Sequence, residues 1–147
     1  MRKQRVSLPL SRLMSNIGGP RQQIRKLLAC TTMPMLMYAE PVWGSLVRFK
    51  SHIKGYESTQ RLASIKQISA HRTVSNCAAN VLAGNIPISM IIKRAAEVRK
   101  AFAEAWHADQ VKAIHDKSMD EWHVLWNNTT KGCWTFELIP ELNECIE

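Results

Sequence analysis

The chain has 147 residues, of which 46% are hydrophobic and 22% are charged, and its formal net charge is +8 at pH 7. This length suits one domain with a modest core, and six Gly and six Pro exclude collagen-like and long low-complexity tracts. The positive charge indicates a polyanionic partner such as nucleic acid, and a basic protein without such a partner is the simple alternative.

The hydrophobic pattern predicts helices along almost the whole chain, beginning with a basic, kinked helix over Arg2–Ser15. Gly18, Gly19 and Pro20 then predict a helix stop followed directly by a helix start. Glycine accepts the left-handed conformation beyond a helix end, and proline suits a first turn. The helix that starts at Pro20 has one apolar stripe, and Pro34 is expected to bend or end it.

The middle of the chain predicts a turn and a third helix. Tyr38–Trp43 contains a proline and two aromatic residues, which is typical of a tight turn packed on the core. Tyr56–Ala70 follows as a helix. Its inward face is predicted to consist of Leu62, Ile65 and Ile68 or Ser69.

A corner between two helices is predicted in the stretch HRTVSNCAANVLAGNIPI, residues 71–88. Ser75 is a suitable N-cap, because its hydroxyl can accept a hydrogen bond from the first turn. Gly84 suits a left-handed C-cap and Pro87 opens the next helix, so the stretch sets a fixed angle. A β-branched residue at Gly84 is expected to destabilise the corner, whereas loss of the Asn85 side chain is expected to matter little. The predicted apolar face of the short helix is Val74, Ala78, Val81 and Leu82.

The longest helix is predicted over Ile88–Lys117. After a break, Met119–Trp126 continues as a helix, Asn127–Gly132 forms a polar turn, and Trp134–Ile146 is rich in apolar residues. The apolar stripe of the longest helix is predicted to be Ile88, Ile92, Ala95, Phe102 and Trp106. No alternation persists long enough to form a sheet, so the sequence predicts an all-α, irregular multi-helix bundle.

The thiols and histidines do not form a recognisable site. The four cysteines are far apart and have neither a CxxC spacing nor a close histidine, so no metal or cofactor is predicted; they are Cys30, Cys77, Cys133 and Cys145. Three histidines recur every eight residues, which rotates them by about 80° on a helix, so solvated side chains are expected; they are His107, His115 and His123. A Cys–His nucleophile pair stays open, although nothing local supports it.

Four tryptophans, one apolar stretch and one acid-free N-terminal stretch allow alternative interpretations. The tryptophans are predicted to pack in the core, with stacking on nucleic-acid bases as the alternative; they are Trp106, Trp122, Trp126 and Trp134. Leu27–Val42 is too short and too interrupted by proline to span a membrane. Met1–Ala39 lacks acids and fits a mitochondrial presequence in composition, but its Gly and Pro residues interrupt an amphipathic helix. A nuclear or cytoplasmic location is therefore preferred over a mitochondrial one.

Charge divides the chain into two halves. Residues 1–72 hold thirteen Lys and Arg against two Glu, a net of +11, and residues 73–147 hold seven against ten acids, a net of −3. This division predicts basic helices over 1–72 and a mildly acidic helical part over 73–147, packed together as one unit. Lys and Arg neutralise backbone phosphates without a sequence code, and a solvated face is the alternative. The cations predicted to bind nucleic acid are Arg21, Arg25, Lys26, Arg48, Lys50, Lys54, Arg61, Lys66 and Arg72.

Four stretches resemble, in the same order, the region that follows the polymerase palm in non-LTR (LINE-type) retrotransposon reverse transcriptases. The first is LSRLMSNIGGPRQQIRKLLA, Leu10–Ala29. Tyr38–Trp43 is similar to the family's Tyr-Gly-Ala-Pro-x-Trp, and His71–Ile88 to its Tyr-Arg-Thr-Val-Ser…Ala-Gly-x-x-Pro-Ile. Trp122–Pro140 is similar to its Trp-x-x-x-Trp…Gly-Arg-Trp-Thr-x-x-Leu-Ile-Pro.

The resemblance implies the thumb and downstream connector of such an enzyme, which grip the RNA or DNA template–primer while the palm performs the chemistry. No polymerase activity is expected, because the palm and endonuclease are missing and the first aspartate is Asp109. A stand-alone helical nucleic-acid-binding protein, or an inert element-derived one, is the alternative. The residues assigned a structural role are Gly18, Gly19, Pro20, Ser75, Gly84, Pro87 and Trp134.

The sequence also departs from the family pattern. Cys133 stands where the family has Arg, and Cys145 where it has a Trp after Leu-Ile-Pro. The link between Trp43 and Arg61 is shortened, and the family's downstream cysteine-rich region is absent. These departures are expected of a truncated or decayed copy of an element.

Overall fold

The computed structural model describes residues 14–15, 18–38, 40–43, 50–104, 108–130, 132–140 and 142. In these ranges every regular element is helical and no strand occurs, which confirms the predicted all-α fold. The helices are α2 (Gln22–Cys30), α3 (Thr32–Met37), α4 (Glu40–Trp43), α5 (Lys50–Gln67), α6 (Asn76–Ala83), α7 (Ile88–Glu104), α8 (Ala108–Asn127) and α9 (Cys133–Leu138). The helix predicted over Arg2–Ser15 lies almost wholly outside the described residues.

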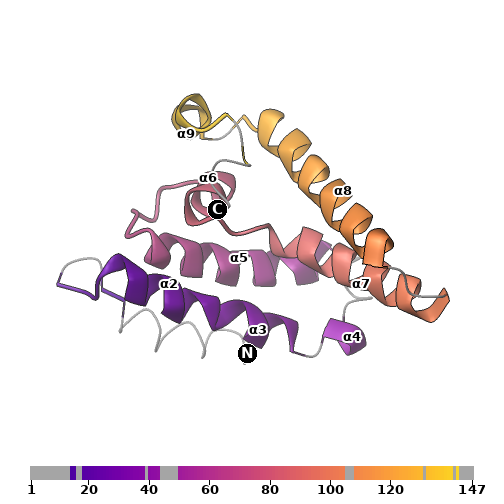
Figure 1. The fold of residues 1–147 in the computed structure, drawn as a ribbon. Coiled ribbons are helices and arrows are strands. Elements are labelled where there is room, and N and C mark those ends of the chain that lie inside the picture. The colour runs from indigo at the N-terminus through magenta and orange to yellow at the C-terminus, as the bar shows by residue number, and fades with distance from the viewer. Residues whose placement is uncertain are drawn as a thin grey trace.

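Helix α5 occupies the centre of the arrangement (Figure 1). Helices α2 and α3 run along one side of α5, and α6 lies on its other side. Helix α7 continues from the corner after α6, and α8 returns from the end of α7 towards α9. The first and second halves of the sequence therefore meet along α5.

The two glycines before α2 are required for different reasons. Gly18 has a φ of +66°, which favours glycine, whereas a Cβ on Gly19 would overlap the Ser15 carbonyl oxygen and the Arg25 guanidinium. The helix begins at Gln22, with Arg21 as its N-cap, so it starts two residues later than Pro20 predicted.

The break after α2 precedes the proline that was expected to cause it. Thr31 separates α2 from α3, and its hydroxyl donates to the Leu28 carbonyl at 2.7 Å. Pro34 lies in the first turn of α3, where a missing N–H costs no intrahelical hydrogen bond.

The prediction of a tight turn at Tyr38–Trp43 was wrong, and the side chain of Trp43 lies outside the described residues. The segment forms the short helix α4, and the Tyr38 side chain is 90% exposed. The buried residue is Glu40, whose carboxylate binds both terminal nitrogens of Arg99 on α7. This hydrogen-bonded pair raises the pKa of Arg99 above its ordinary value. Tyr38 is thus outside the core, whereas the Glu40 carboxylate is buried and paired with the partly exposed Arg99.

Helix α5 begins at Lys50, before the predicted Tyr56, and ends at Gln67, before the predicted Ala70. Ile65 is buried as expected, but Ser69 is exposed, so the alternative that placed it inward was wrong. Ser69 follows the helix end with a φ of +56°. The N–H groups of Ser69 and Ala70 return to the carbonyls of Lys66 and Ile65, at 3.4 and 3.0 Å.

Both caps predicted for the corner are confirmed. Ser75 Oγ accepts a hydrogen bond from Ala78 N at 3.2 Å, and Gly84 is left-handed with a φ of 67°. The N–H of Gly84 donates to Val81 O and that of Asn85 to Asn80 O, which is the Schellman arrangement. On the predicted apolar face, Ala78 and Val81 are buried, Val74 is half-buried and Leu82 is exposed.

The long helix predicted over Ile88–Lys117 is two helices, and no break follows Lys117. Helix α7 ends at Glu104, and α8 runs without interruption through Ser118, whose hydroxyl donates to Ile114 O at 2.8 Å. Pro87 is the residue before α7, and its carbonyl accepts from the first turn. Of the predicted α7 stripe, Ile88 and Ile92 are buried, Ala95 is half-buried, Phe102 is exposed, and Trp106 lies outside the described residues.

The second half of the chain contains an apolar core between α6, α7, α8 and α9. Two tryptophans of α8 belong to it, which confirms the core role predicted for them. Trp126 Nε1 donates to Ile139 O at 3.0 Å, and its ring lies 5.7 Å from that of Phe136. Trp134 is 83% exposed, so a core role for it was wrong. The buried members of the core are Ala78, Val81, Met90, Trp122, Trp126 and Leu142.

Candidate nucleic-acid interface

Three polar side chains on one face of α5 hold the corner between α6 and α7. Gln60, Ser64 and Gln67 are spaced four and three residues apart, so they share a helix face, and all three are buried. The hydrophobic pattern did not reveal this set, because it marks only apolar residues for the inward face of α5.

Gln60 binds the chain on both sides of Pro87. Its amide nitrogen donates to Ile86 O at 2.7 Å, and its amide oxygen accepts from Ile88 N at 2.8 Å. The N–H of Ile88 lies at the start of α7, where no intrahelical acceptor exists. Gln60 therefore satisfies two backbone groups that proline and the helix start leave without helical partners.

Ser64 and Gln67 bind the end of α6. Ser64 Oγ lies 3.0 Å from both Asn80 Oδ1 and Asn85 Nδ2, and Gln67 donates to Ala83 O at 2.9 Å. The Asn85 amide also donates to Gln67 Oε1 at 3.1 Å. The Asn85 amide thus joins α5 to the corner, which argues against the expectation that this side chain matters little.

Arg25 does not belong with the predicted phosphate-binding cations. The residue is 4% exposed, and its guanidinium donates to the carbonyls of Pro20, at 2.9 Å, Lys66, at 3.0 Å, and Ser15. Three backbone acceptors satisfy the charge in the interior, so the side chain is not presented to a ligand. Arg25 instead joins the start of α2 to the end of α5.

The other predicted cations differ in how the structure presents them. Arg21, Lys26, Lys54 and Arg72 are exposed, and Lys66 is half-buried. None of these five makes an ion pair within the part of the chain that the structure describes. We call these five residues the basic set. Arg48 and the side chain of Lys50 lie outside the described residues.

Two parts of the basic set meet where α2 begins and α5 ends. Because Arg25 donates to the Lys66 carbonyl, the α2 start that carries Arg21 lies beside the last turn of α5. Lys26 follows about one turn along α2. Residues 41 positions apart in sequence are thus joined, which brings the backbone of Arg21 and Lys66 to the same end of the α2–α5 pair.

Two cations of the second half are paired with acids. Arg99 binds Glu40, and Lys117 lies 3.6 Å from Glu97. Such pairing reduces the positive potential that these residues present to a polyanion. The structure thus accentuates the charge difference between the halves that the sequence shows.

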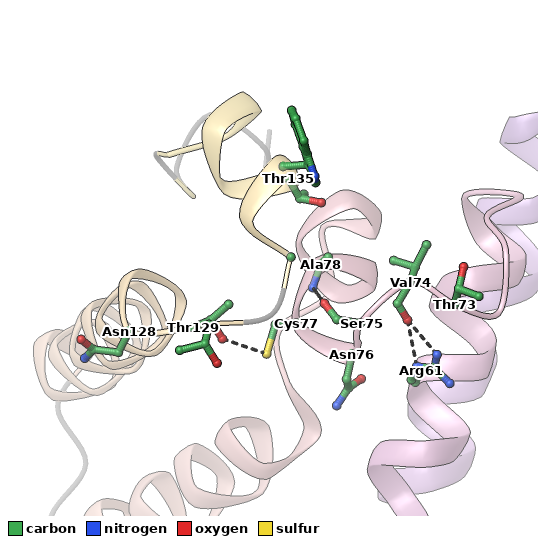
Figure 2. A pocket seen from close by; sticks show the side chains of 13 residues that line it. Arg61, Thr73, Val74, Ser75, Asn76, Cys77, Ala78, Asn128, Thr129 and Thr135 are labelled. Carbon is green, nitrogen blue, oxygen red and sulfur yellow. Dashed lines mark hydrogen bonds between the residues drawn. The ribbon is translucent and has the colours of Figure 1, made fainter.

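A groove of about 860 Å³ opens between the start of α6 and the connection from α8 to α9 (Figure 2). Arg61 lies at one end and Asn128 and Thr129 at the other. Its described lining is rich in hydroxyl and amide groups and includes no acid. The lining residues are Arg61, Thr73, Val74, Ser75, Asn76, Cys77, Ala78, Asn128, Thr129, Thr130, Gly132, Trp134 and Thr135.

Arg61 is fixed at the edge of this groove. Its Nε and Nη2 donate to Val74 O, at 3.3 and 2.7 Å, and Nη2 also donates to Arg72 O. Nη1 makes no hydrogen bond to any part of the chain that is described. The side chain thus binds the loop before α6 through Nε and Nη2.

The opposite wall approaches α6 closely at Gly132. Its φ is +98°, and a Cβ there would lie 3.1 Å from Ser75 Oγ and 3.2 Å from the Ala78 Cβ. Thr129 Oγ1 donates to the exposed thiol of Cys77 at 3.5 Å across the same groove. Glycine at position 132 therefore lets the α8–α9 connection pack against the α6 start.

Neither a metal site nor a membrane span is found among the described residues. No three His, Cys, Asp or Glu side chains lie close enough to hold an ion, and this includes His115 and His123 on α8. No described helix is both long and apolar enough to cross a bilayer. His107 lies outside the described ranges.

Comparison of the chain with protein families, with curated proteins and with solved structures found no match.

Proposed function

We propose that this chain binds the backbone of nucleic acid through its basic half, as the thumb and connector part of a non-LTR retrotransposon reverse transcriptase. The observation that carries the proposal is the basic set. These five cations project from the half that carries a net +11 and make no ion pair in the described chain. Surface cations without an acidic partner can release counterions from phosphates without any base-specific contact.

The arrangement around α5 supports a gripping role. A clamp must hold its cations rigidly enough to meet phosphates together. Arg25 joins α2 to α5 through the Lys66 carbonyl and to the segment before α2 through the carbonyls of Ser15 and Pro20. The second half is fixed to the same helix through Gln60, Ser64 and Gln67. The role proposed for this chain is positioning, with no nucleotidyl transfer of its own, and the location expected for that role is the nucleus or cytoplasm.

Binding of a blunt RNA–DNA hybrid tests this proposal. Fluorescence anisotropy of a labelled hybrid, about 16 base pairs long, should give binding at low salt that weakens steeply as salt is raised. Hybrids of unrelated sequence should bind equally well, because no base-reading side chain is involved. Absence of binding at low salt by a chain that circular dichroism shows to be helical would overturn the proposal.

A further inference from the structure

We infer that the groove between the α6 start and the α8–α9 connection binds an unpaired nucleotide of the nucleic acid that the basic half holds. This inference rests on the proposed function and extends it to a second site. The basic set lies on α2, α5 and the segment after α5, whereas the groove adds residues of α6, α8 and α9. The groove and the basic set adjoin at Arg61 and Arg72, because Arg61 Nη2 donates a hydrogen bond to the Arg72 carbonyl.

The wall formed by α9 provides a surface for base stacking. Trp134 lines the groove and is 83% exposed, although an indole of this size is normally covered. Trp122 and Trp126, in contrast, are buried in the core. A nucleobase can stack on an exposed indole whatever its sequence, because every base has a π-face.

The polar part of the lining can hydrogen-bond a sugar and a phosphate. Beside its apolar surface, the groove has five hydroxyl-bearing residues and two asparagines. Arg61 supplies a fixed cation whose Nη1 has no partner in the described chain. None of the described lining residues is an acid that would oppose a phosphate.

Cys77 provides a direct measure of occupancy, because its thiol is exposed and lines the groove. A chain that retains only Cys77, with the other three cysteines changed to Ser, would be treated with a maleimide in the presence of an oligo(U) about 12 nucleotides long. The matched control retains only Cys30, which is also exposed but lies at the end of α2. We expect oligo(U) to slow modification of Cys77 and to leave Cys30 unchanged.

The contribution of stacking is tested by Trp134→Ala. Its control is Leu138→Ala on the same short helix, because Leu138 is 80% exposed and does not line the groove. Removal of a stacking platform for one base should weaken oligo(U) binding at least about fivefold and abolish Cys77 protection. Leu138→Ala should retain both.

The outcomes separate the groove from the proposed function. If the blunt hybrid binds but oligo(U) and oligo(dT) both fail to protect Cys77, the groove inference is wrong and the basic half keeps its role. Equal protection of Cys77 and Cys30, or equal protection by a polyglutamate of the same charge, also overturns the inference. Protection by oligo(U) alone, or by both oligonucleotides, supports it and identifies which sugar the groove accepts.

Discussion

The side chain of Gln60 makes two hydrogen bonds around Pro87, accepting from Ile88 N at 2.8 Å and donating to Ile86 O at 2.7 Å. Gln60 belongs to the basic half, and it thereby satisfies two backbone groups of the second half. The angle of the corner is determined by α5 as well as by the caps within residues 71–88. The most informative stability experiments therefore change side chains on α5.

Gln60→Ala should destabilise the protein by about 2–4 kcal/mol. It leaves the buried Ile88 N–H and the part-buried Ile86 carbonyl without partners, and a buried polar group without a partner costs about 1–3 kcal/mol. Urea unfolding followed by circular dichroism measures the change. Gln23→Ala on the exposed face of α2 is the matched control and should shift the free energy of unfolding by less than about 0.5 kcal/mol. Equal effects of the two changes would contradict the hydrogen bonding described for Gln60.

Gly84→Val should lower the melting temperature, because a side chain at a φ of 67° costs roughly 1–2 kcal/mol in backbone strain. Gly84→Asn should cost less, since asparagine tolerates this conformation. Gly55→Ala, within α5, is the control and should be neutral or slightly stabilising, because alanine favours a helix. A loss from Gly55→Ala as large as that from Gly84→Val would argue against the left-handed cap.

Arg25→Met should reduce stability by about 2–3 kcal/mol, since it removes the charged donor to three half-buried carbonyls. Arg25→Lys should not restore the loss, because an ammonium cannot reproduce the planar fork. Differential scanning calorimetry of both variants, with exposed Arg21→Met as control, measures the effect. If Arg25→Met proves as mild as the control, the side chain is at the surface after all.

Arg99→Gln should destabilise the protein because it leaves the buried Glu40 carboxylate without its partner. The cost should be about 1–2 kcal/mol, reduced by the partial exposure of Arg99. The pKa of Arg99 is raised by Glu40, so the stabilisation is present below the ordinary arginine pKa and is lost only as pH rises through the folded value. Unfolding measured at about pH 7 and about pH 9, both below that range, should therefore give the same difference. A difference that disappears at the higher pH would contradict this assignment.

The caps were predictable from sequence and the hydrogen bonds of α5 were not. Ser75 and Gly84 act within one or two turns of their own position, so local sequence determines them. Arg25 was predicted to bind phosphate because it clusters with Arg21 and Lys26 at a helix start, away from the apolar stripe. Its three acceptors come from backbone up to 41 residues away, and no sequence pattern marks a carbonyl as available.

The groove illustrates the same limit. Trp134 was predicted to pack in the core because most of the four tryptophans fall on the apolar stripes of predicted helices. Whether it is covered depends on where the short helix α9 lies relative to α6, and that position follows from the close approach at Gly132. The charge difference between the halves, in contrast, was visible from counting alone, and the structure added which cations are paired.

The salt dependence of binding tests the central claim most directly. Arg21→Gln, Lys26→Gln and Lys66→Gln together remove three cations of the basic set, and Arg25 is left unchanged because it supports the fold. The control variant removes the same charge from the second half. It carries Lys93→Gln, Arg94→Gln and Lys112→Gln.

We predict that the first variant binds duplex DNA at least about tenfold more weakly at low salt. Its plot of log affinity against log salt should be shallower by about 0.9 for each phosphate that the variant no longer neutralises, and the control should keep the wild-type slope. An unchanged slope in the first variant, or an equal change in the control, would contradict the assignment of nucleic-acid binding to the basic half.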